Sequence, residues 1–488
     1  MTTAVLILLC LLLVLLLILI VSIVVFMKTE NPADDLLEPC DYLIVYASQS
    51  GSTQHYAELT SVHLNHLGLS SNTININNLT KDHFQKNQKI IFMVSTYGEG
   101  DAPDSAQSFT RWFFHRNLDL SQLHIAVLAF GDRRYHKFCG FGEMLYQQLV
   151  HYGAKPWFDL STVDQQSSID LQHWNTLLGQ VIGHRLQIES QQRHWHQVQL
   201  SERYLLNSGS QGNGLYHIVL EHSPALSWQS GDLLELRCSN THNELKHFQQ
   251  SYPLIDDEKL ILFKFKNLRL IPNHQNDLSL EQWRDQFEDL PLREYSIASI
   301  PQQKYLGLVV RQEMSHQGIG LGSGLLTQKL NIGESLDVCI RSNPSFHLKP
   351  SQTPCIFIGN GSGIAGLMAH LHQCELQENL GNWLIFGERQ QQFDAIFSEQ
   401  LTWWQREGTL AQLDLVYSRD HSDYKYVQDV LCSKKQQLKS WIENGACIYV
   451  CGSLNGMAKA VDDQLKAILG EQQFNLLKQQ QRYLRDVY

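Results

Sequence analysis

Short apolar runs separated by amphipathic stretches recur in two parts of the chain. In the first part, the apolar runs cover residues 42–47, 90–95 and 125–130. The amphipathic stretches between them cover residues 53–67 and 106–116. In the last part, the apolar runs cover residues 354–358, 383–386, 413–417 and 447–450. Strands that alternate with helices are typical of doubly wound parallel sheets, so we expect an α/β fold with one such sheet in each part.

Between these two parts, the pattern changes to short runs in which apolar and polar residues alternate. Examples are residues 214–220 and 231–237, which lie near glycine and serine turns. This pattern predicts an antiparallel barrel. The stretch 241–289 looks irregular, with Trp283 and Phe287 on a possible short helix. For a chain of 488 residues we therefore expect three domains, at residues 41–184, 185–350 and 351–488.

The first residues form a long apolar stretch. Residues 4–27 contain no charged side chain, and Ser22 is their one polar residue. At about 1.5 Å per residue, this stretch makes a helix of about 36 Å, enough to cross a hydrocarbon layer of roughly 30 Å. A cleaved signal peptide would have a basic start, a shorter apolar core and a small-residue cleavage site, none of which is clear here. With Lys28 as the first charge, the pattern predicts a single-pass membrane helix, a tether at residues 28–40 and a cytoplasmic catalytic portion.

Charge and cysteine content narrow the possible partners. The formal net charge of −11 argues against nucleic-acid binding, which requires clustered Lys and Arg. Between Glu30 and His184 there are 16 acidic and 9 basic residues. Such an acidic excess either steers a basic partner protein or only keeps the domain soluble, and both interpretations stay open from the sequence. The 10 cysteines include no C-x-x-C pair, so we expect reduced thiols and no metal site.

Three polar loops follow the apolar runs of the first part. Because the carboxyl ends of parallel strands meet at one edge of a sheet, these loops should converge on one ligand. Hydroxyl and backbone N–H groups of the first loop can hold a phosphate without Arg or Lys. Tyr97 and Tyr135 in the other two loops offer rings that can sandwich an isoalloxazine. The candidate binding residues are Ser48, Gln49, Ser50, Gly51, Ser52, Thr53, Ser95, Thr96, Tyr97, Gly98, Phe130, Gly131, Asp132, Tyr135, Phe138 and Cys139.

In the barrel region, Arg293, Tyr295 and Ser296 lie on one predicted strand. An Arg can clamp a pyrophosphate, the Tyr can stack on a ring, and the Ser hydroxyl can approach the ring nitrogen that accepts a hydride. A glycine-rich turn at residues 320–323 then precedes a predicted helix at residues 324–330. The N-terminus of this helix is a second place where an anion can bind. The candidate residues of this region are Arg293, Glu294, Tyr295, Ser296, Gly320, Leu321, Gly322 and Ser323.

In the last part, a glycine-rich loop at residues 359–366 follows the first apolar run, as in nucleotide-binding turns. No acidic residue closes the next run, at residues 383–386, to bind a ribose, and Gly387-Glu-Arg389 stands there instead. After the third apolar run come Ser418, Arg419 and Lys425. A 2′-phosphate is bound by a hydroxyl group together with Arg and Lys, so we expect the nucleotide to be NADP rather than NAD. The candidate residues are Gly361, Ser362, Gly363, Ser418, Arg419, Lys425, Tyr426 and Gln428.

Together these loops resemble the NADPH-dependent diflavin reductases, of the sulfite reductase flavoprotein and haemoprotein reductase type. Residues 48–53, 95–101 and 130–139 are similar to the three FMN loops of flavodoxin-type domains. Residues 293–296 with 320–323 are similar to the FAD site of ferredoxin–NADP reductase-type barrels. The resemblance implies a flavodoxin-like sheet, an FAD-binding barrel and an NADP-binding parallel sheet, with FMN, FAD and NADPH as cofactors.

The resemblance also implies roles for single residues. It places a further FMN contact near Asp164 and the hydride-transfer residues at Ser296, Cys451 and Asp486. The final Tyr488 would cover the FAD ring and swing aside for nicotinamide. Residues 417–420 and 426–428 resemble the 2′-phosphate motif, although its usual Lys comes one position late, at Lys425, and Ser453 replaces the usual Asp of a following motif. The helical connecting module of the family is much reduced here.

The resulting prediction is a membrane-anchored oxidoreductase that passes electrons from NADPH to FAD, to FMN and to a haem- or iron-containing acceptor protein. The expected partners are this acceptor, with a basic docking face if the acidic excess steers it, and the lipid bilayer. Two alternatives stay open: a membrane reductase of ferric chelates or quinones, and a non-catalytic flavodoxin-like docking module.

Overall fold

The computed structural model describes residues 40–488 except 49–50, 134, 165–166, 189–192, 223–225, 254, 274–277, 316–317, 350–352 and 421–422. The chain divides into two compact units between residues 192 and 193. The first unit holds one parallel sheet, and the second holds an antiparallel sheet, a small hairpin and a second parallel sheet.

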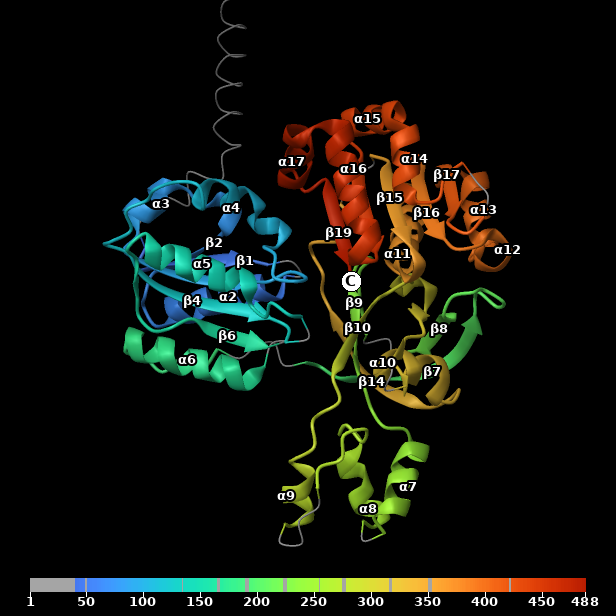
Figure 1. The fold of residues 1–488 in the computed structure, drawn as a ribbon, viewed down its shortest axis with the longest axis horizontal. Coiled ribbons are helices and arrows are strands. Elements are labelled where there is room, and N and C mark those ends of the chain that lie inside the picture. Colours follow the sequence, from blue (N-terminus) through green and yellow to red (C-terminus); the bar gives the residue numbers. More distant parts are fainter. Residues whose placement is uncertain are drawn as a thin grey trace, which may run out of the picture. The chain divides into compact units, whose positions relative to one another are not determined.

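The first unit is a parallel sheet between two layers of helices (Figure 1). Its strands follow the order β2–β1–β3–β4–β5, and β6 also pairs with β4. This is the order of flavodoxin-like doubly wound sheets, as predicted. The strands are β1 (Tyr42–Ala47), β2 (Ser71–Asn75), β3 (Lys89–Ser95), β4 (His124–Gly131), β5 (Lys155–Pro156) and β6 (Ser161–Asp164).

Helices cover both faces of this sheet because alternate side chains of a strand point to opposite faces. Leu43 and Val45 of β1 pack in a core with α3, α4 and α5. Tyr42 and Ile44 pack instead with α2 and α6. The helices are α2 (Ser52–His66), α3 (Lys81–Lys86), α4 (Gln107–Phe113), α5 (Gly140–His151) and α6 (Ser168–Ile182).

The second unit begins with the predicted antiparallel barrel. Its strands follow the order β10–β9–β14–β7–β8–β11, and a bridge between Ile297 and Leu308 joins the residue after β10 to β11. Inward side chains such as Leu234 and Leu236 form its core. The strands are β7 (His196–Leu205), β8 (Leu215–Glu221), β9 (Leu233–Arg237), β10 (Leu292–Ser296), β11 (Leu306–Arg311) and β14 (Ser335–Arg341), with the hairpin β12 (Met314–Ser315) and β13 (Gly318–Ile319). The helix predicted at residues 324–330 begins earlier, as α10 (Leu321–Gly324), and continues as a π-helical turn at Leu325–Lys329.

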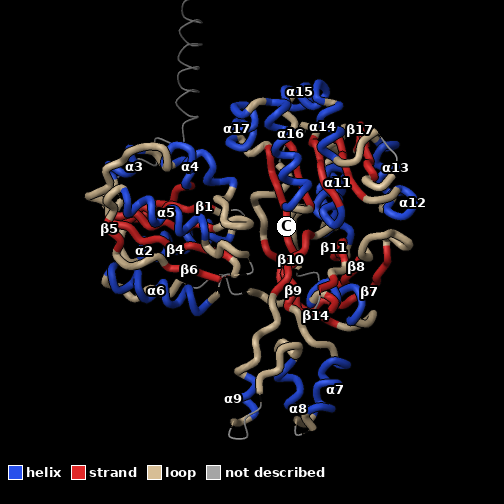
Figure 2. The backbone as a smooth tube through the Cα atoms, in the orientation of Figure 1, coloured by secondary structure: helices blue, strands red, loops and turns tan. Residues whose placement is uncertain are grey.

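A lobe of short helices is inserted between β9 and β10 (Figures 1 and 2). It comprises α7 (His242–Ser251), α8 (Asp257–Leu260) and α9 (Leu280–Arg284). Phe248, Phe263, Trp283 and Phe287 form its own buried core. The prediction of an irregular stretch was therefore wrong, although Trp283 does lie on a short helix. The aromatic side chains that hold the lobe together are too far apart in the chain to give a local pattern.

The last part of the second unit is the second predicted parallel sheet, with the order β17–β16–β15–β18–β19. Helix α11 packs on one face and α14–α17 on the other. The strands are β15 (Cys355–Asn360), β16 (Asn382–Glu388), β17 (Leu410–Tyr417), β18 (Cys447–Gly452) and β19 (Tyr483–Val487). The helices are α11 (Ile364–Leu376), α12 (Gln391–Asp394), α13 (Ser398–Glu407), α14 (Val427–Ser433), α15 (Lys435–Glu443), α16 (Lys459–Leu469) and α17 (Glu471–Gln479).

The predicted membrane localisation requires correction. A helix that spans a bilayer needs about 20 mostly apolar residues. Within the described part of the chain no helix meets this condition, and the longest ones, α2 and α6, have 15 residues each. This finding contradicts the prediction of a single-pass protein with a cytoplasmic catalytic portion, which we do not retain. The proposed span itself, residues 4–27, lies outside the described residues.

Candidate functional site

The candidate FMN residues gather at the carboxyl edge of the sheet in the first unit. Ser95 at the end of β3 lies opposite Phe130 of β4, and Gly131 lies opposite Asp164 of β6. Strand β1 ends at Ala47, next to β3 and directly before the first loop. The sheet therefore brings the three predicted loops and Asp164 to the same edge.

The first loop leads into α2 and carries groups that fit a phosphate. The hydroxyl oxygens of Ser48 and Thr53 are buried and have no hydrogen-bond partner among the described residues. Gly51 has a φ of 83° directly before the helix, a conformation that glycine adopts without strain. Because a buried hydroxyl without a partner costs free energy, a bound phosphate oxygen would stabilise this loop. Of the other loop residues, Ser52 begins α2, whereas Gln49 and Ser50 lie outside the described residues.

The two candidate stacking tyrosines lie on the second and third loops. Tyr97 and Asp101 each donate a backbone N–H to the other's carbonyl at 2.9 Å, which closes the second loop around Gly98. Tyr97 is half-buried, whereas the side chain of Tyr135 is 37% exposed. Their stacking on a flavin stays a prediction. At the start of the second loop, Ser95 and Thr96 form hydrogen bonds within the protein, to the carbonyl of Ala47 at 3.2 Å and from the N–H of Phe141 at 3.3 Å.

The third loop closes tightly between β4 and α5. Cys139 has a φ of 56°, and its thiol donates to the carbonyl of Ala129 at 3.2 Å. Burial raises the pKa of this thiol to about 12, so the group is neutral. A Cβ on Gly131 would lie 2.7 Å from the backbone N of Cys139, so this close approach requires glycine. Cys139 thus shapes the loop through its backbone.

Asp164 and Phe138 both contact Arg133 of the same loop. The carboxylate of Asp164 accepts the backbone N–H of Arg133 at 3.1 Å, and the guanidinium lies 4.6 Å from the ring centroid of Phe138. Tyr135 in turn donates its N–H to the carbonyl of Asp132 at 3.1 Å. These contacts fix the loop that carries Tyr135.

The candidate FAD residues meet where β10 faces the turn before α10. A Cβ on Gly322 would lie 2.6 Å from Oη of Tyr295 and 2.7 Å from Cγ of Arg293. Only a glycine lets the turn approach the strand this closely, which is the cradle that a pyrophosphate beside Arg293 would need. Glu294 lies apart from this cradle, since Arg341 binds its carboxylate at 2.7 Å. Gly320 and Ser323 shape the turn, because Gly320 donates its N–H to the carbonyl of Glu313 and Ser323 Oγ accepts the N–H of Glu313.

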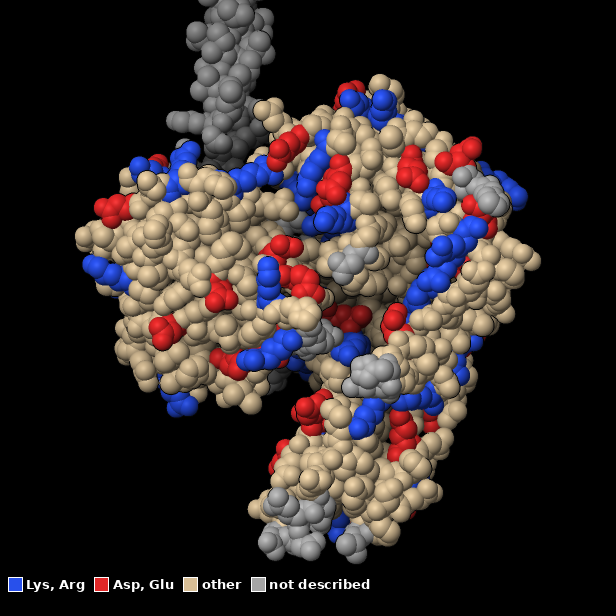
Figure 3. Space-filling model, viewed as in Figure 1, with Lys and Arg blue, Asp and Glu red and all other residues tan. Residues whose placement is uncertain are grey.

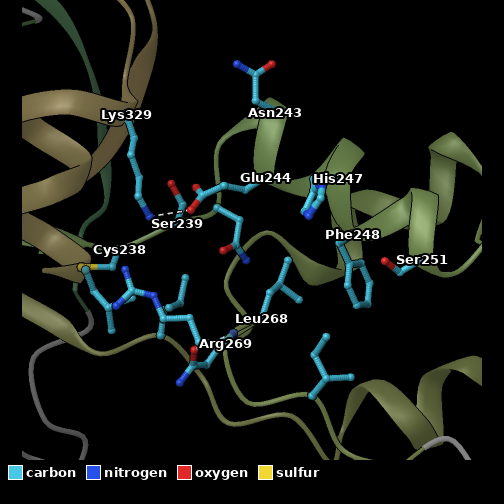
Figure 4. Close-up of a pocket in the computed structure, with 15 residues that line it drawn as sticks. Cys238, Ser239, Asn243, Glu244, His247, Phe248, Ser251, Leu268, Arg269 and Lys329 are labelled. Atoms are coloured by element: carbon cyan, nitrogen blue, oxygen red, sulfur yellow. Dashed lines mark hydrogen bonds and ion pairs between the residues drawn. The ribbon is translucent and has the colours of Figure 1, made fainter. Parts of the chain in front are cut away.

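A cavity of about 490 Å³ separates the helical lobe from the barrel next to this turn (Figure 4). Leu321 of the turn lines it together with Arg269 and His247. Across it, Lys329 Nζ binds Glu244 of α7 at 2.5 Å. Arg269 donates to the carbonyl of Ile319 at 2.6 Å. The reduced connecting lobe therefore still borders the candidate FAD turn.

The three predicted hydride-transfer residues lie together within the second unit. Ser296, at the end of β10, donates its hydroxyl to Oδ2 of Asp486 at 2.7 Å. The thiol of Cys451 lies 3.8 Å from the same oxygen, because β18 and β19 place Cys451 opposite Asp486. Burial raises the pKa of both Asp486 and Cys451, and the raised pKa of the thiol keeps it neutral. The role of this cluster in hydride transfer stays a prediction.

Tyr488 lies on the glycine-rich loop of the nucleotide sheet. Its hydroxyl donates to Oγ of Ser362 at 3.0 Å, and its backbone N–H donates to the carbonyl of Gly452 at 3.1 Å. Its side chain is 55% exposed. The backbone carbonyl of Tyr488 also accepts the N–H of Leu454 at 2.9 Å, so backbone hydrogen bonds hold the chain end beside the loop. The displacement of the Tyr488 ring by a ligand stays a prediction.

The glycine-rich loop has the close approach that a nucleotide turn requires. A Cβ on Gly363 would clash with the carbonyl oxygen of Cys451, and Gly361 has a φ of 57°. Helix α11 begins directly after the loop, so free N–H groups and the positive end of the helix dipole face this space. The loop therefore fits a phosphate group.

The candidate 2′-phosphate residues lie beyond the edge strand β17. The backbone N–H groups of Ser418 and Arg419 donate to the carbonyls of Glu388, the last residue of β16, and of Arg389, the residue after it. The carboxylate of Asp429 accepts the N–H groups of Lys425 and Tyr426, both at 3.0 Å, and fixes the start of α14, which contains Gln428. Tyr426 is 53% exposed, so its ring is open to a ligand. The roles of these residues stay predictions.

The comparisons with known proteins concern the domains and the family of this chain. Residues 44–174 match the flavodoxin family, and residues 357–463 match the oxidoreductase NAD-binding domain. The chain is similar to the sulfite reductase [NADPH] flavoprotein alpha-component of Photobacterium profundum, with 26% identity over 91% of this chain and 88% of the relative. The protein of the same name from Buchnera aphidicola subsp. Acyrthosiphon pisum is 24% identical over 96% of this chain and 92% of the relative.

These matches confirm several predictions at once. The order of a flavodoxin domain and a nucleotide domain in one chain, and relatives that align over nearly its whole length, identify a flavoprotein oxidoreductase that uses FMN, FAD and NADPH. The non-catalytic docking module is thereby set aside. The roles of the single site residues and the domain limits stay predictions. The two domain matches and the sulfite reductase flavoprotein relatives support the family of NADPH-dependent diflavin reductases.

Proposed function

We propose that this chain passes electrons from NADPH through FAD and FMN to a haem- or iron-containing acceptor protein. The observation that supports this most is the cluster of Ser296, Cys451 and Asp486, which joins the candidate FAD strand to the nucleotide sheet at 2.7 Å and 3.8 Å. When bound, the nicotinamide and the flavins supply the redox chemistry, with hydride transfer followed by transfer of single electrons.

The protein residues hold and shield the reacting rings. Arg293 and the turn at Gly322 grip the FAD pyrophosphate, and Ser296 offers a hydroxyl at the hydride-accepting edge of the ring. Asp486 holds that hydroxyl in place and, because burial raises its pKa, can retain a proton nearby. Tyr488 covers the site until the nucleotide displaces it.

The acceptor is proposed from the relatives. Their name describes the alpha-component of an NADPH sulfite reductase, so a second component is expected to receive the electrons. A small ferric chelate or quinone is the alternative acceptor. The acidic excess of residues 30–184 supports a basic docking face, although acidic and basic side chains are both spread over the visible face of the first unit (Figure 3).

Acceptor turnover tests this proposal. The purified protein with NADPH should reduce a basic haem protein such as cytochrome c, and kcat/KM should fall as salt screens the docking charges. Ferric citrate and a soluble quinone serve as comparison acceptors under the same conditions. Reduction of the small acceptors alone, with no turnover of any haem or iron protein, would overturn the proposed acceptor class.

We further propose that the cavity at Arg269 holds the adenosine end of FAD. Its volume of about 490 Å³ lies within the usual range of ligand sites, roughly 300–1,000 Å³, and it adjoins the candidate pyrophosphate turn. Arg269→Ala should weaken FAD binding about tenfold and leave FMN in place, because one hydrogen-bonded cation is lost from the FAD cavity only. Flavin content after gel filtration measures this. Arg284→Ala, on the same lobe but paired with its neighbour Asp285, is the control and should retain both flavins.

Removal of the Tyr488 side chain tests its role as a cover. Tyr488→Ala should tighten NADP⁺ binding about fivefold, since the nucleotide no longer has to break the hydrogen bond to Ser362. Turnover should slow, because a tighter product leaves later. The dissociation constant and kcat measure the two effects, and Tyr204→Ala on β7 is the control. Weaker NADP⁺ binding in Tyr488→Ala would show that the ring supports the nucleotide rather than competes with it.

A further inference from the structure

A buried ion pair joins the barrel to the nucleotide sheet beside the glycine-rich loop. Arg311 ends β11, and its Nη2 donates to Oε1 of Glu388 on β16 at 2.8 Å. The two side chains are 18% and 4% exposed. Nη1 of Arg311 donates to the carbonyl of Asn213 at 3.0 Å. These bonds use two of the five N–H groups of the guanidinium.

The same guanidinium lies against the loop itself. A Cβ on Gly361 would lie 3.5 Å from Nη2 and 3.8 Å from Nε of Arg311. Gly361 opens the loop that precedes α11, where backbone N–H groups face a bound phosphate. A phosphate bound on this loop would therefore lie within reach of Arg311.

Burial and several charged neighbours shift the pKa of Glu388 in opposite directions. Burial raises its pKa and Asp394 adds to this effect, while Arg311 and Arg389 lower it. Tyr417 lies opposite Glu388 in the register of β16 and β17, and the carboxylate adds to the rise in the pKa of Tyr417 that burial causes. A buried ion pair contributes little to stability compared with apolar side chains of the same size. A role in ligand binding is therefore a better explanation of this pair than stability.

We propose that Arg311 is a second anchor for the NADPH pyrophosphate and that Glu388 is its partner only while the loop is free. This inference rests on the proposed function. Nucleotide binding then exchanges one anion for another at the guanidinium, with no covalent step. Glu388 holds Arg311 beside the loop in the free protein and competes with the nucleotide for it. It therefore sets the NADPH affinity without touching the reacting rings.

Equilibrium binding to the oxidised holoprotein tests the exchange. NADP⁺ carries the pyrophosphate, whereas 2′-AMP carries the 2′-phosphate without it and serves as the matched ligand. Arg311→Met should weaken NADP⁺ binding at least tenfold and change 2′-AMP binding by less than about threefold. Glu388→Gln should tighten NADP⁺ binding about three- to tenfold, again with 2′-AMP unchanged. The control is Lys434→Met, which breaks the pair with Asp414 elsewhere on the same sheet and should alter neither ligand.

A second variant keeps the test valid if Arg311→Met fails to fold because Glu388 is left buried and unpaired. The double variant Arg311→Met, Glu388→Gln removes both charges and should show the same selective loss of NADP⁺ affinity. Equal losses for NADP⁺ and 2′-AMP, or weaker NADP⁺ binding in Glu388→Gln, would overturn the inference. Failure of the proposed function is distinguishable, because the unaltered protein would then show no flavin reduction by NADPH.

Discussion

Replacing Ser296 and Cys451 together by alanine is expected to slow flavin reduction by NADPH about a hundredfold or more. The two groups share Oδ2 of Asp486, at 2.7 Å and 3.8 Å, so their removal takes both of these contacts from this oxygen. Losses of this order are typical when groups that stabilise a transition state or position a proton are deleted. The dissociation constant of NADP⁺ should change less than about threefold, because neither side chain belongs to the candidate phosphate loops. Anaerobic stopped-flow absorbance measures the reduction rate.

A matched variant separates this effect from a general loss of packing. Cys374 is as deeply buried as Cys451 but lies in the core of α11, and Ser335 is an exposed residue at the start of β14. The double variant Ser335→Ala, Cys374→Ala should reduce its flavin at the unaltered rate. An unchanged rate in Ser296→Ala, Cys451→Ala would remove the cluster from the mechanism.

Replacing Tyr97 and Tyr135 together by alanine is expected to remove FMN and to abolish reduction of a protein acceptor. Each ring contributes about 0.5–1.5 kcal/mol beyond buried area, so the loss of both weakens FMN binding about 10- to 100-fold. FAD content and its reduction by NADPH should persist, because these residues lie in the first unit and the FAD candidates lie in the second. Acid extraction and chromatography of the flavins measure the content of each.

Tyr146→Ala is the control for this pair, since Tyr146 packs against the core from α5 in the same unit. It should retain both flavins. Excess FMN added to the double variant Tyr97→Ala, Tyr135→Ala should restore its reduction of the protein acceptor. Retention of FMN by the double variant would show that the phosphate loop alone holds the cofactor and that the two rings do not stack on it.

The loops could be predicted because each follows a strand whose apolar run is unmistakable. Residues 42–47 predict β1 with both limits correct, and the hydroxyl-rich loop after it follows directly. Strand β2 could not be predicted, because Ser71–Asn75 is mostly polar and is held by pairing with β1. Strand β19 was not predicted for a similar reason, because Arg485 and Asp486 interrupt its apolar pattern. The role of Asp486 therefore came from family resemblance alone.

Contacts between distant residues explain the remaining gaps. Arg311 and Glu388 are 77 positions apart, and only the packing of the barrel on the nucleotide sheet brings them together. The sequence shows Glu388 next to Arg389 but does not show which cation it binds. The cavity at Arg269 likewise arises only once the helical lobe has folded against the barrel.

Add-back of FMN to protein stripped of that flavin tests the order of electron transfer most directly. After removal of FMN, NADPH should still bleach the remaining FAD at the unaltered rate, while transfer to a haem protein should stop. One equivalent of FMN per chain should restore the transfer. If the FMN-free protein reduced the haem protein as fast as before, electrons would leave from FAD, and the proposed path through the first unit would be wrong.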